Sequence, residues 1–389
     1  MRPDDFEHSP AGKCIRTYRD YCAFVPNPLP PAIEYDAQLA RLLSDADRLI
    51  GELSGIGRVI KNPYLLISPY IRREAVSSSK IEGTQSSLSD LFFYEATDKI
   101  TTQAPDVKEV HNYVQALTKG IPLLEKLPIS TRLICELHQI LMKDVRGEHG
   151  TPGELRRSQN WIGPPGCTLN EATYVPPPVD EMNKALSDWE KYLNSEPKEP
   201  VLIQAALMHC QFEAIHPFID GNGRIGRLLI SIFLHNTGAL SQPLLYLSEF
   251  FEKYRTEYYE RLLSVSQKGL WKEWIEFFLR GVINMSQSAL DNAKKIVSLY
   301  DQYSELLIAN KKTPEIAHRL LDELFTSIVI SISALSKQWN VAYTSVKHGV
   351  KSLESLNIVR ESSGKSRNKL YVSQDLLKII LPDYKSKND

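Results

Sequence analysis

The spacing of apolar residues predicts a mostly helical protein. Apolar side chains recur every three or four positions along most of the chain, as they do on the buried face of an amphipathic helix. Leu39, Leu43, Ala46 and Leu49 are a clear example. The pattern predicts helices over residues 35–53, 70–83, 106–119, 131–141, 201–212, 228–234, 247–263 and 271–310.

Two stretches interrupt this helical period. Residues 1–34 contain many prolines and no clear period, which predicts an extended arm that wraps the body. Within residues 150–178, two short β-type segments, 159–162 and 173–175, flank a turn region rich in glycine and proline. This arrangement predicts a β-hairpin, although an irregular surface loop fits the periodicity equally well.

The C-terminal segment predicts a separate unit. A short helix from Ile332, a turn near Asn340 and a second helix to Leu356 precede a hairpin-like stretch, and the whole resembles a DNA-binding winged helix. From Ile330 onward there are ten Lys or Arg and five Asp or Glu residues, and the basic loop 365–369 could contact phosphate. An interaction or dimerisation module fits the same pattern. The second helix would offer DNA these side chains: Tyr343, Thr344, Ser345, Lys347 and His348.

Composition is that of an ordinary globular protein. The chain has 389 residues, 42% of them apolar and 24% charged, and a net charge of −1, so no overall field points to nucleic acid or membrane. No apolar run is long enough to span a bilayer, and the N-terminus has no apolar signal region. The five cysteines form no C-x-x-C pair, which argues against a disulfide framework or zinc site. We expect a cytoplasmic protein without a membrane partner.

The polar stretch 216–227 lies between two predicted helices. Its three glycines let the backbone approach a ligand, and the first N–H groups of the following helix attract anions. Arg224 and Arg227 share the helix face behind that site. Asp220 can hold Mg²⁺ that bridges phosphates, and His216 suits a general base near neutral pH. The stretch predicts a polyphosphate site, and a purely structural helix corner is the competing interpretation.

The same residues match a known signature. His-Pro-Phe-x-Asp-Gly-Asn-Gly-Arg-x-x-Arg is typical of Fic-domain proteins, and residues 216–227 match every fixed position. The chain thus resembles a Fic-domain protein adenylyltransferase over about residues 30–300. This resemblance implies a helical core that transfers AMP from ATP to a hydroxyl on a protein. It assigns His216 as base, Asp220 as Mg²⁺ ligand, Gly221, Asn222 and Gly223 as phosphate cradle, Arg224 as phosphate ligand and Arg227 as γ-phosphate ligand.

A second motif lies upstream, at the end of a predicted helix. Ser78 and Glu82 are one turn apart on one face, and Gly83 suits the helix end. A solvated acid is the simplest interpretation of Glu82, but a helix C-terminus disfavours anions, so a nearby cation is expected. The pattern Ser-x-x-x-Glu-Gly resembles the inhibitory motif of Fic proteins. That resemblance implies that Glu82 pairs with Arg227 and keeps basal activity low.

Three further features gain meaning from the resemblance. The predicted hairpin resembles the family's flap, which lies over the active site and is thought to hold the target's main chain by strand addition. Tyr259 could stack on the nucleotide, although core packing explains its helix equally well. His111 and His138 have no partner spacing and are predicted to be ordinary helix residues.

Together these features predict a mostly α protein with a Fic helical core, a β-hairpin flap and a C-terminal winged-helix domain. The predicted divisions are residues 1–105 with the inhibitory motif, 106–300 as catalytic core and 301–389 as winged helix. The predicted function is autoinhibited transfer of AMP from ATP, with Mg²⁺, to a Ser, Thr or Tyr of a target protein and of the chain itself. Removal of AMP with Glu82 as base, and a nucleotide-sensing DNA-binding regulator, remain open, as does a homodimer.

Overall fold

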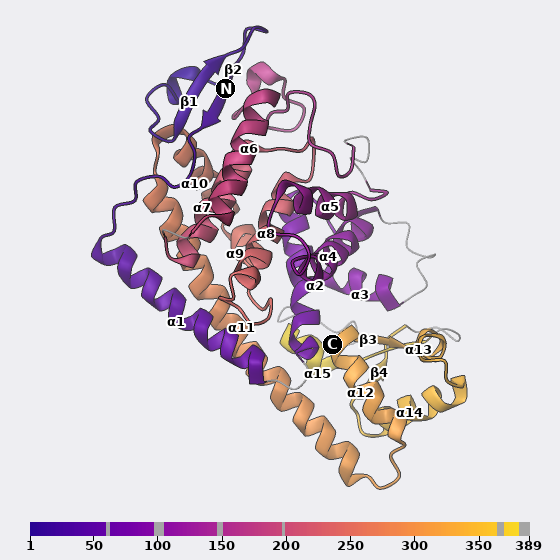
Figure 1. Ribbon diagram of the computed structural model, residues 1–389. Coiled ribbons are helices and arrows are strands. Elements are labelled where there is room, and N and C mark those ends of the chain that lie inside the picture. Colours follow the sequence, from indigo (N-terminus) through magenta and orange to yellow (C-terminus); the bar gives the residue numbers. More distant parts are fainter. Residues whose placement is uncertain (60–62, 97–104, 146–150, 197–198, 364–368, 381–389) are drawn as a thin grey trace.

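The computed structural model describes residues 1–59, 63–96, 105–145, 151–196, 199–363 and 369–380. Helices dominate it (Figure 1). The helices of the body are α1 (Ala37–Val59), α2 (Tyr64–Ile81), α3 (Leu88–Ala96), α4 (Pro105–Leu123), α5 (Thr131–Leu141), α6 (Val179–Asn194), α7 (Val201–Ile215), α8 (Asn222–Asn236), α9 (Ser248–Lys253), α10 (Arg255–Lys268) and α11 (Trp271–Ala309), with short 3₁₀ turns η1 (Pro3–Asp5) and η3 (Leu169–Glu171). The mostly helical prediction is confirmed.

The centre of the body is α7, whose side chains are nearly all buried. Helices α6, α8, α10 and α11 pack around it. Two buried indoles fix its neighbours, because Trp189 of α6 donates to the carbonyl of Met208 and Trp274 of α11 donates to that of Ala206, at 3.0 and 2.9 Å. Since α7 and α8 enclose the stretch 216–221, this core rigidly positions the polar loop.

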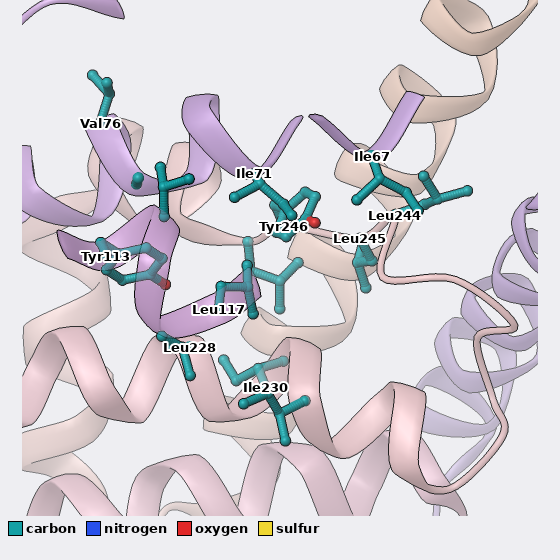
Figure 2. Packing of buried hydrophobic residues seen from close by; sticks show 14 of the residues in the cluster. Ile67, Ile71, Val76, Tyr113, Leu117, Leu228, Ile230, Leu244, Leu245 and Tyr246 are labelled. Carbon is teal, nitrogen blue, oxygen red and sulfur yellow. The ribbon is translucent and has the colours of Figure 1, made fainter. Parts of the chain in front are cut away.

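A second part of the core lies between α2, α4 and α8. Figure 2 shows Ile71 of α2, Leu117 of α4 and Leu228 of α8 pointing toward one another, with Tyr246 closing one side. All of these side chains are buried. The packing places the C-terminal end of α2, and with it Glu82, against the first turns of α8.

The N-terminal arm differs from the prediction. It forms an antiparallel hairpin of β1 (Gly12–Arg16) and β2 (Cys22–Pro26), with Gly12 opposite Pro26. Phe6 and Phe24 pack on the ring of Tyr174, with centroids 6.1 Å away in both cases. The arm lacks a clear sequence period because its strands are short and consecutive residues of β2 are buried on both faces.

The helix predicted over 247–263 is two helices. The backbone leaves the helical region at Tyr254 (φ −109°, ψ 39°), where α9 ends and α10 begins. Both pieces contribute to one aromatic cluster, in which Phe251 and Tyr258 stack at 4.6 Å and both contact the buried His209. The prediction of one continuous helix was wrong because this tertiary packing outweighs local helix propensity.

The C-terminal unit follows the long helix α11, which runs alongside α1 (Figure 1). It contains a three-stranded antiparallel sheet in the order β3–β5–β4. The predicted helix, turn and helix are present, and Asn340, in the left-handed region at φ 53°, ends the first of them. Of the predicted basic loop 365–369, residues 365–368 lie outside the described residues. The elements are α12 (Glu315–Ser327), β3 (Val329–Ser331), α13 (Ile332–Trp339), α14 (Tyr343–Ser355), β4 (Arg360–Glu361), β5 (Leu370–Val372) and α15 (Gln374–Ile380).

The C-terminal unit is packed on the body. Helix α12 lies against α2, β3 lies against α3, and α15 contacts α11. Tyr303 of α11 contributes a hydroxyl that bonds to Asp375 at 3.0 Å. Within the described ranges, no helix combines the length and the apolar character needed to cross a lipid bilayer.

Candidate functional site

The site is built on the loop between α7 and α8. His216 ends α7 in the left-handed conformation (φ 51°), and its N–H still bonds to the carbonyl of Phe212 at 3.0 Å. Gly221 precedes α8 with φ 81°, and a Cβ there would lie 2.9 Å from the sulfur of Met142. Both turns direct the loop so that the first N–H groups of α8, which lack intrahelical acceptors, face outward from the helix end.

Three side chains hold this loop in place. Asn222 accepts from the N–H of Phe218 and donates to its carbonyl, both at 2.8 Å. Asn160 donates to the carbonyls of Phe218 and His216, at 2.8 and 3.2 Å. Arg156, which is 1% exposed, donates from Nε to the carbonyl of His216 at 2.9 Å. The loop is therefore fixed before any ligand binds.

The imidazole of His216 is held by a backbone contact. Its Nδ1 lies 3.2 Å from the carbonyl oxygen of Glu213, so a proton on Nδ1 satisfies that acceptor and leaves Nε2 unprotonated. Burial is the main reason that the pKa of His216 is lowered to about 4, and the charge of Arg156 lowers it further. The neutral imidazole therefore dominates at pH 7.

His216 lines a cavity of about 660 Å³. The rings of Trp161 and Tyr259, which are 42% and 41% exposed, lie at its edge. Several residues predicted from the sequence line the cavity, among them Glu82, His216 and Arg227. Its polar lining includes Glu82, Glu213, His216, Arg227, Arg255 and Glu260.

Arg227 is a buried cation of the site, with 1% of its side chain exposed. Its Nε donates to the hydroxyl of Ser78 at 2.9 Å, and its Nη2 donates to Glu82 at 2.6 Å and to the Ser78 carbonyl at 3.0 Å. The contact predicted between Glu82 and Arg227 is therefore present. Burial is the largest single influence and would raise the pKa of Glu82, but the charge and hydrogen bond of Arg227, together with the charge of Arg224, lower it overall.

Gly223 explains how Glu82 comes so close to α8. A Cβ at this position would lie 2.3 Å from Oε1 of Glu82 and 2.9 Å from Nη1 of Arg227. Any side chain would therefore displace the carboxylate. Glu82 therefore occupies the space beside Gly223, the glycine that the signature assigns to the phosphate cradle.

Arg224, in the first turn of α8, is also buried. Its guanidinium lies 3.5 Å from Glu109 and 3.5 Å from Asp220. The side chain of Asp220 is 51% exposed, and its Oδ1 accepts from the N–H of Gly221 at 2.5 Å. Among the described residues, no group of three or more His, Cys, Asp or Glu side chains is arranged to hold a metal ion.

Four supporting residues were not identified from the sequence. Arg156 and Asn160 lie on a loop about sixty residues before the signature, and no periodicity marks them. His138 is more than an ordinary helix residue, because its ring stacks on Phe218 with centroids 3.8 Å apart and its Nε2 lies 3.0 Å from the carbonyl of Asp220. Burial raises the pKa of the fourth, Glu213, to about 8.

The predicted hairpin beside the site has fewer paired residues than expected. A single antiparallel bridge joins Ile162 and Tyr174, with backbone bonds of 2.9 to 3.0 Å. The flanking prolines, which have no N–H to donate, limit the ladder to this bridge. The bridge still places Trp161 and Ile162 at the rim of the cavity.

Comparison with known proteins gives two family matches. The profile described as "Fic/DOC family N-terminal" matches residues 40–122, and the one described as "Fic/DOC family" matches residues 128–234. A curated relative from Drosophila grimshawi, "Protein adenylyltransferase Fic", is 31% identical over 200 residues, which are 49% of this chain and 37% of that protein. Its counterpart from Drosophila virilis is 28% identical over 237 residues, 59% of this chain and 44% of that protein. The chain thus spans about two fifths of the length of these relatives.

A solved structure has the same fold. The crystal structure of a Fic family protein from Desulfovibrio desulfuricans G20 superposes with a TM-score of 0.58 at 17% identity. The superposition covers 89% of this chain and 98% of that one. The similarity therefore extends beyond the two matched regions to most of the helical architecture.

The role of Asn222 as a loop clamp can be tested by stability. Asn222→Ala should lower the free energy of unfolding by about 1–3 kcal/mol, because the buried N–H of Phe218 loses its acceptor and the Phe218 carbonyl keeps only the bond from Asn160. Asn222→Asp keeps the acceptor for the Phe218 N–H but places a second oxygen against the Phe218 carbonyl, so it should also be destabilising. Urea denaturation measures both, with Asn284→Ala on the exposed face of α11 as a control that should be nearly neutral. Native stability of Asn222→Ala would contradict the clamp.

Proposed function

The chain belongs to the Fic/DOC family, and on this premise we propose that it transfers AMP from ATP to a hydroxyl group of a target protein. The observation that carries the proposal is the neutral imidazole of His216 beside the unpaired N–H groups of α8, with two arginines behind them. The names of the curated relatives support the same reaction.

In the proposed reaction His216 removes the proton of a Ser, Thr or Tyr hydroxyl. The hydroxyl oxygen attacks the α-phosphorus of ATP, and pyrophosphate leaves. The carbonyl of Glu213 holds the imidazole in the tautomer that leaves Nε2 free to accept the proton. Because the loop is fixed by Arg156 and Asn160, the base is positioned without reorganisation, which is how enzymes of this kind lower the barrier.

The phosphates would be held by backbone and side chains together. Of the predicted cradle Gly221, Asn222 and Gly223, the backbone N–H groups of Asn222 and Gly223 are the candidates, since the Asn222 side chain is used by the loop itself and the N–H of Gly221 donates to Asp220. Arg224 and Arg227 supply the positive charge.

The residues present fit Mg²⁺. One half-exposed carboxylate, that of Asp220, suits a cation that proteins bind through one or two carboxylates together with substrate phosphates. Asp220 would hold the ion, which supplies charge neutralisation for the leaving pyrophosphate. His138 keeps the Asp220 carbonyl in place and so steadies this side of the loop.

Target and nucleotide would approach along the cavity rim. The half-exposed ring of Tyr259 is the candidate for stacking on the adenine. The bridge at Ile162 leaves backbone groups that an extended target segment could pair with. Self-modification, a homodimer and a cytoplasmic location stay predictions from the sequence.

We further propose that Glu82 inhibits the resting protein. Its carboxylate accepts a hydrogen bond from Nη2 of Arg227 and fills the space beside Gly223. The γ-phosphate would need both the donor and the space. A carboxylate and a phosphate cannot share this guanidinium without like-charge repulsion. Basal transfer should therefore be slow until Glu82 moves away.

Transfer of label from α-labelled ATP tests both proposals. Glu82→Gly should label protein at least about tenfold more strongly than the native chain, because it removes a charge-assisted hydrogen bond and the competing charge. Adding His216→Ala to Glu82→Gly should abolish the labelling, since no base remains.

Two controls define the outcome of this experiment. γ-Labelled ATP should give no labelling of any variant, because the γ-phosphate leaves with pyrophosphate. If no variant transfers the α-label to itself or to a protein mixture, AMP transfer is wrong for this chain. If native protein instead strips label from a modified target and Glu82→Gln does not, removal of AMP with Glu82 as base becomes the better description.

The pH dependence of the Glu82→Gly variant tests the state of His216. A base with a lowered pKa is active above that pKa, so the rate should be lost only as the pH falls toward about 4. At pH 5.5 the variant should keep most of its rate at pH 7.5, whereas an ordinary histidine would keep about a tenth. Initial labelling rates between pH 4.5 and 8 measure this, with circular dichroism as a check on folding. An acid limb centred near 6.5 would contradict a buried, neutral His216.

Binding of duplex DNA by α14 is a second candidate function. The supporting observation is that Tyr343, Lys347, His348 and Lys351 are exposed along one side of this helix. In fluorescence anisotropy, DNA affinity should fall as the salt concentration rises. The double variant Lys347→Ala, Lys351→Ala should reduce the slope of log affinity against log salt concentration by about one for each lysine removed. Exposed Lys191→Ala on α6 is the control. Absence of binding at low salt would exclude this function.

A further inference from the structure

The segment directly after Glu82 is held from outside by α4. The hydroxyl of Thr84 donates to Oε2 of Glu109 at 3.1 Å, and the N–H of Gln85 donates to Asp106 at 2.9 Å. Asp106 and Glu109 are three residues apart, so they lie on one face of α4 near its start. Two carboxylates of a neighbouring helix therefore hold the chain just beyond Glu82.

The joint between Glu82 and this segment provides little restraint of its own. Gly83 has φ 94°, and nothing lies within 4 Å of the position that a Cβ would occupy. The last turn of α2 is thus followed by a residue without packing contacts on that side. The end of α2 is therefore restrained by hydrogen bonds, and Thr84 makes two of them. Its N–H donates to the carbonyl of Ser79, and its hydroxyl donates to Glu109.

The contact of Thr84 with Glu109 is buried. Thr84 is 5% exposed and Glu109 is 7% exposed. The same Oε2 of Glu109 lies 3.5 Å from Nη1 of Arg224, which is itself buried. One carboxylate oxygen therefore touches both the Glu82 segment and an arginine of the signature.

We propose that Thr84, Glu109 and Asp106 are positioning residues of the inhibitory contact. The bonds of the two carboxylates to Thr84 and Gln85 form a latch that keeps the end of α2, and so Glu82, against Arg227. This inference rests on the proposed function, in which Glu82 inhibits. Without the latch the last turn of α2 frays, because a buried carboxylate loses a donor and the residue after Gly83 is no longer fixed. Glu82 then leaves Arg227 more often, and the γ-phosphate finds the guanidinium free.

The experiment compares Thr84→Val with Thr84→Ser in the full chain. Valine has nearly the same shape but no hydroxyl, while serine keeps the donor. Hydrogen exchange followed by mass spectrometry should show that the backbone amides of residues 79–87 exchange about tenfold faster in Thr84→Val and at the native rate in Thr84→Ser. Unchanged exchange of residues 79–87 in Thr84→Val would overturn the latch.

Activity gives a second, independent readout. Labelling from α-labelled ATP should rise by about three- to tenfold in Thr84→Val, and the same substitution should add nothing in the Glu82→Gly background. A fall in labelling in both backgrounds would overturn the proposal, since it would mean a direct role in transfer. Faster exchange of residues 79–87 together with no labelling by Glu82→Gly would support the latch while refuting AMP transfer.

A loss of folding would be recognised by faster exchange across the whole chain. In that case Asp106→Ala, which removes the acceptor for Gln85, is judged by the same two criteria. Faster exchange confined to residues 79–87 in that variant supports the latch, and native exchange there contradicts it.

Discussion

The structure depends on the way in which one buried guanidinium is satisfied. Arg227 has 1% of its side chain exposed, and a buried cation is costly unless it is paired and hydrogen-bonded. Its partners come from the end of α2, where Ser78 contributes a hydroxyl and a carbonyl and Glu82 a carboxylate. The charge balance of α8 is thus completed by a helix about 150 residues earlier in the chain.

The same requirement orders α2 along its length. Glu74, Ser78 and Glu82 are four residues apart and share one face of the helix. Glu74 is fully buried and accepts from the hydroxyls of Tyr113 and Ser248, at 3.1 and 2.5 Å. Burial raises the pKa of Glu74, and its donors oppose that effect. A continuous polar stripe therefore sets the register of α2 against α4, α8 and α9, and this register places Glu82 in the site.

The loop beside this contact is held by other side chains. Arg156, Asn160, Asn222 and His138 bond to the backbone of His216, Phe218 and Asp220, so the position of His216 does not depend on Glu82. In the proposed function, inhibition through Arg227 would therefore leave His216 and the loop in place.

The sequence by itself determined the helical class, the helices α7 and α8 around the loop, and the glycines and charged residues of the signature, because periodicity and turn residues act locally. Tertiary structure decided the rest. The end of one helical segment at Tyr254 and the start of another, the pairing of β1 with β2, and the contacts of Arg156 and His138 with the loop all join residues far apart in the chain. Such contacts arise from burial and the satisfaction of buried polar groups, which have no period in the sequence.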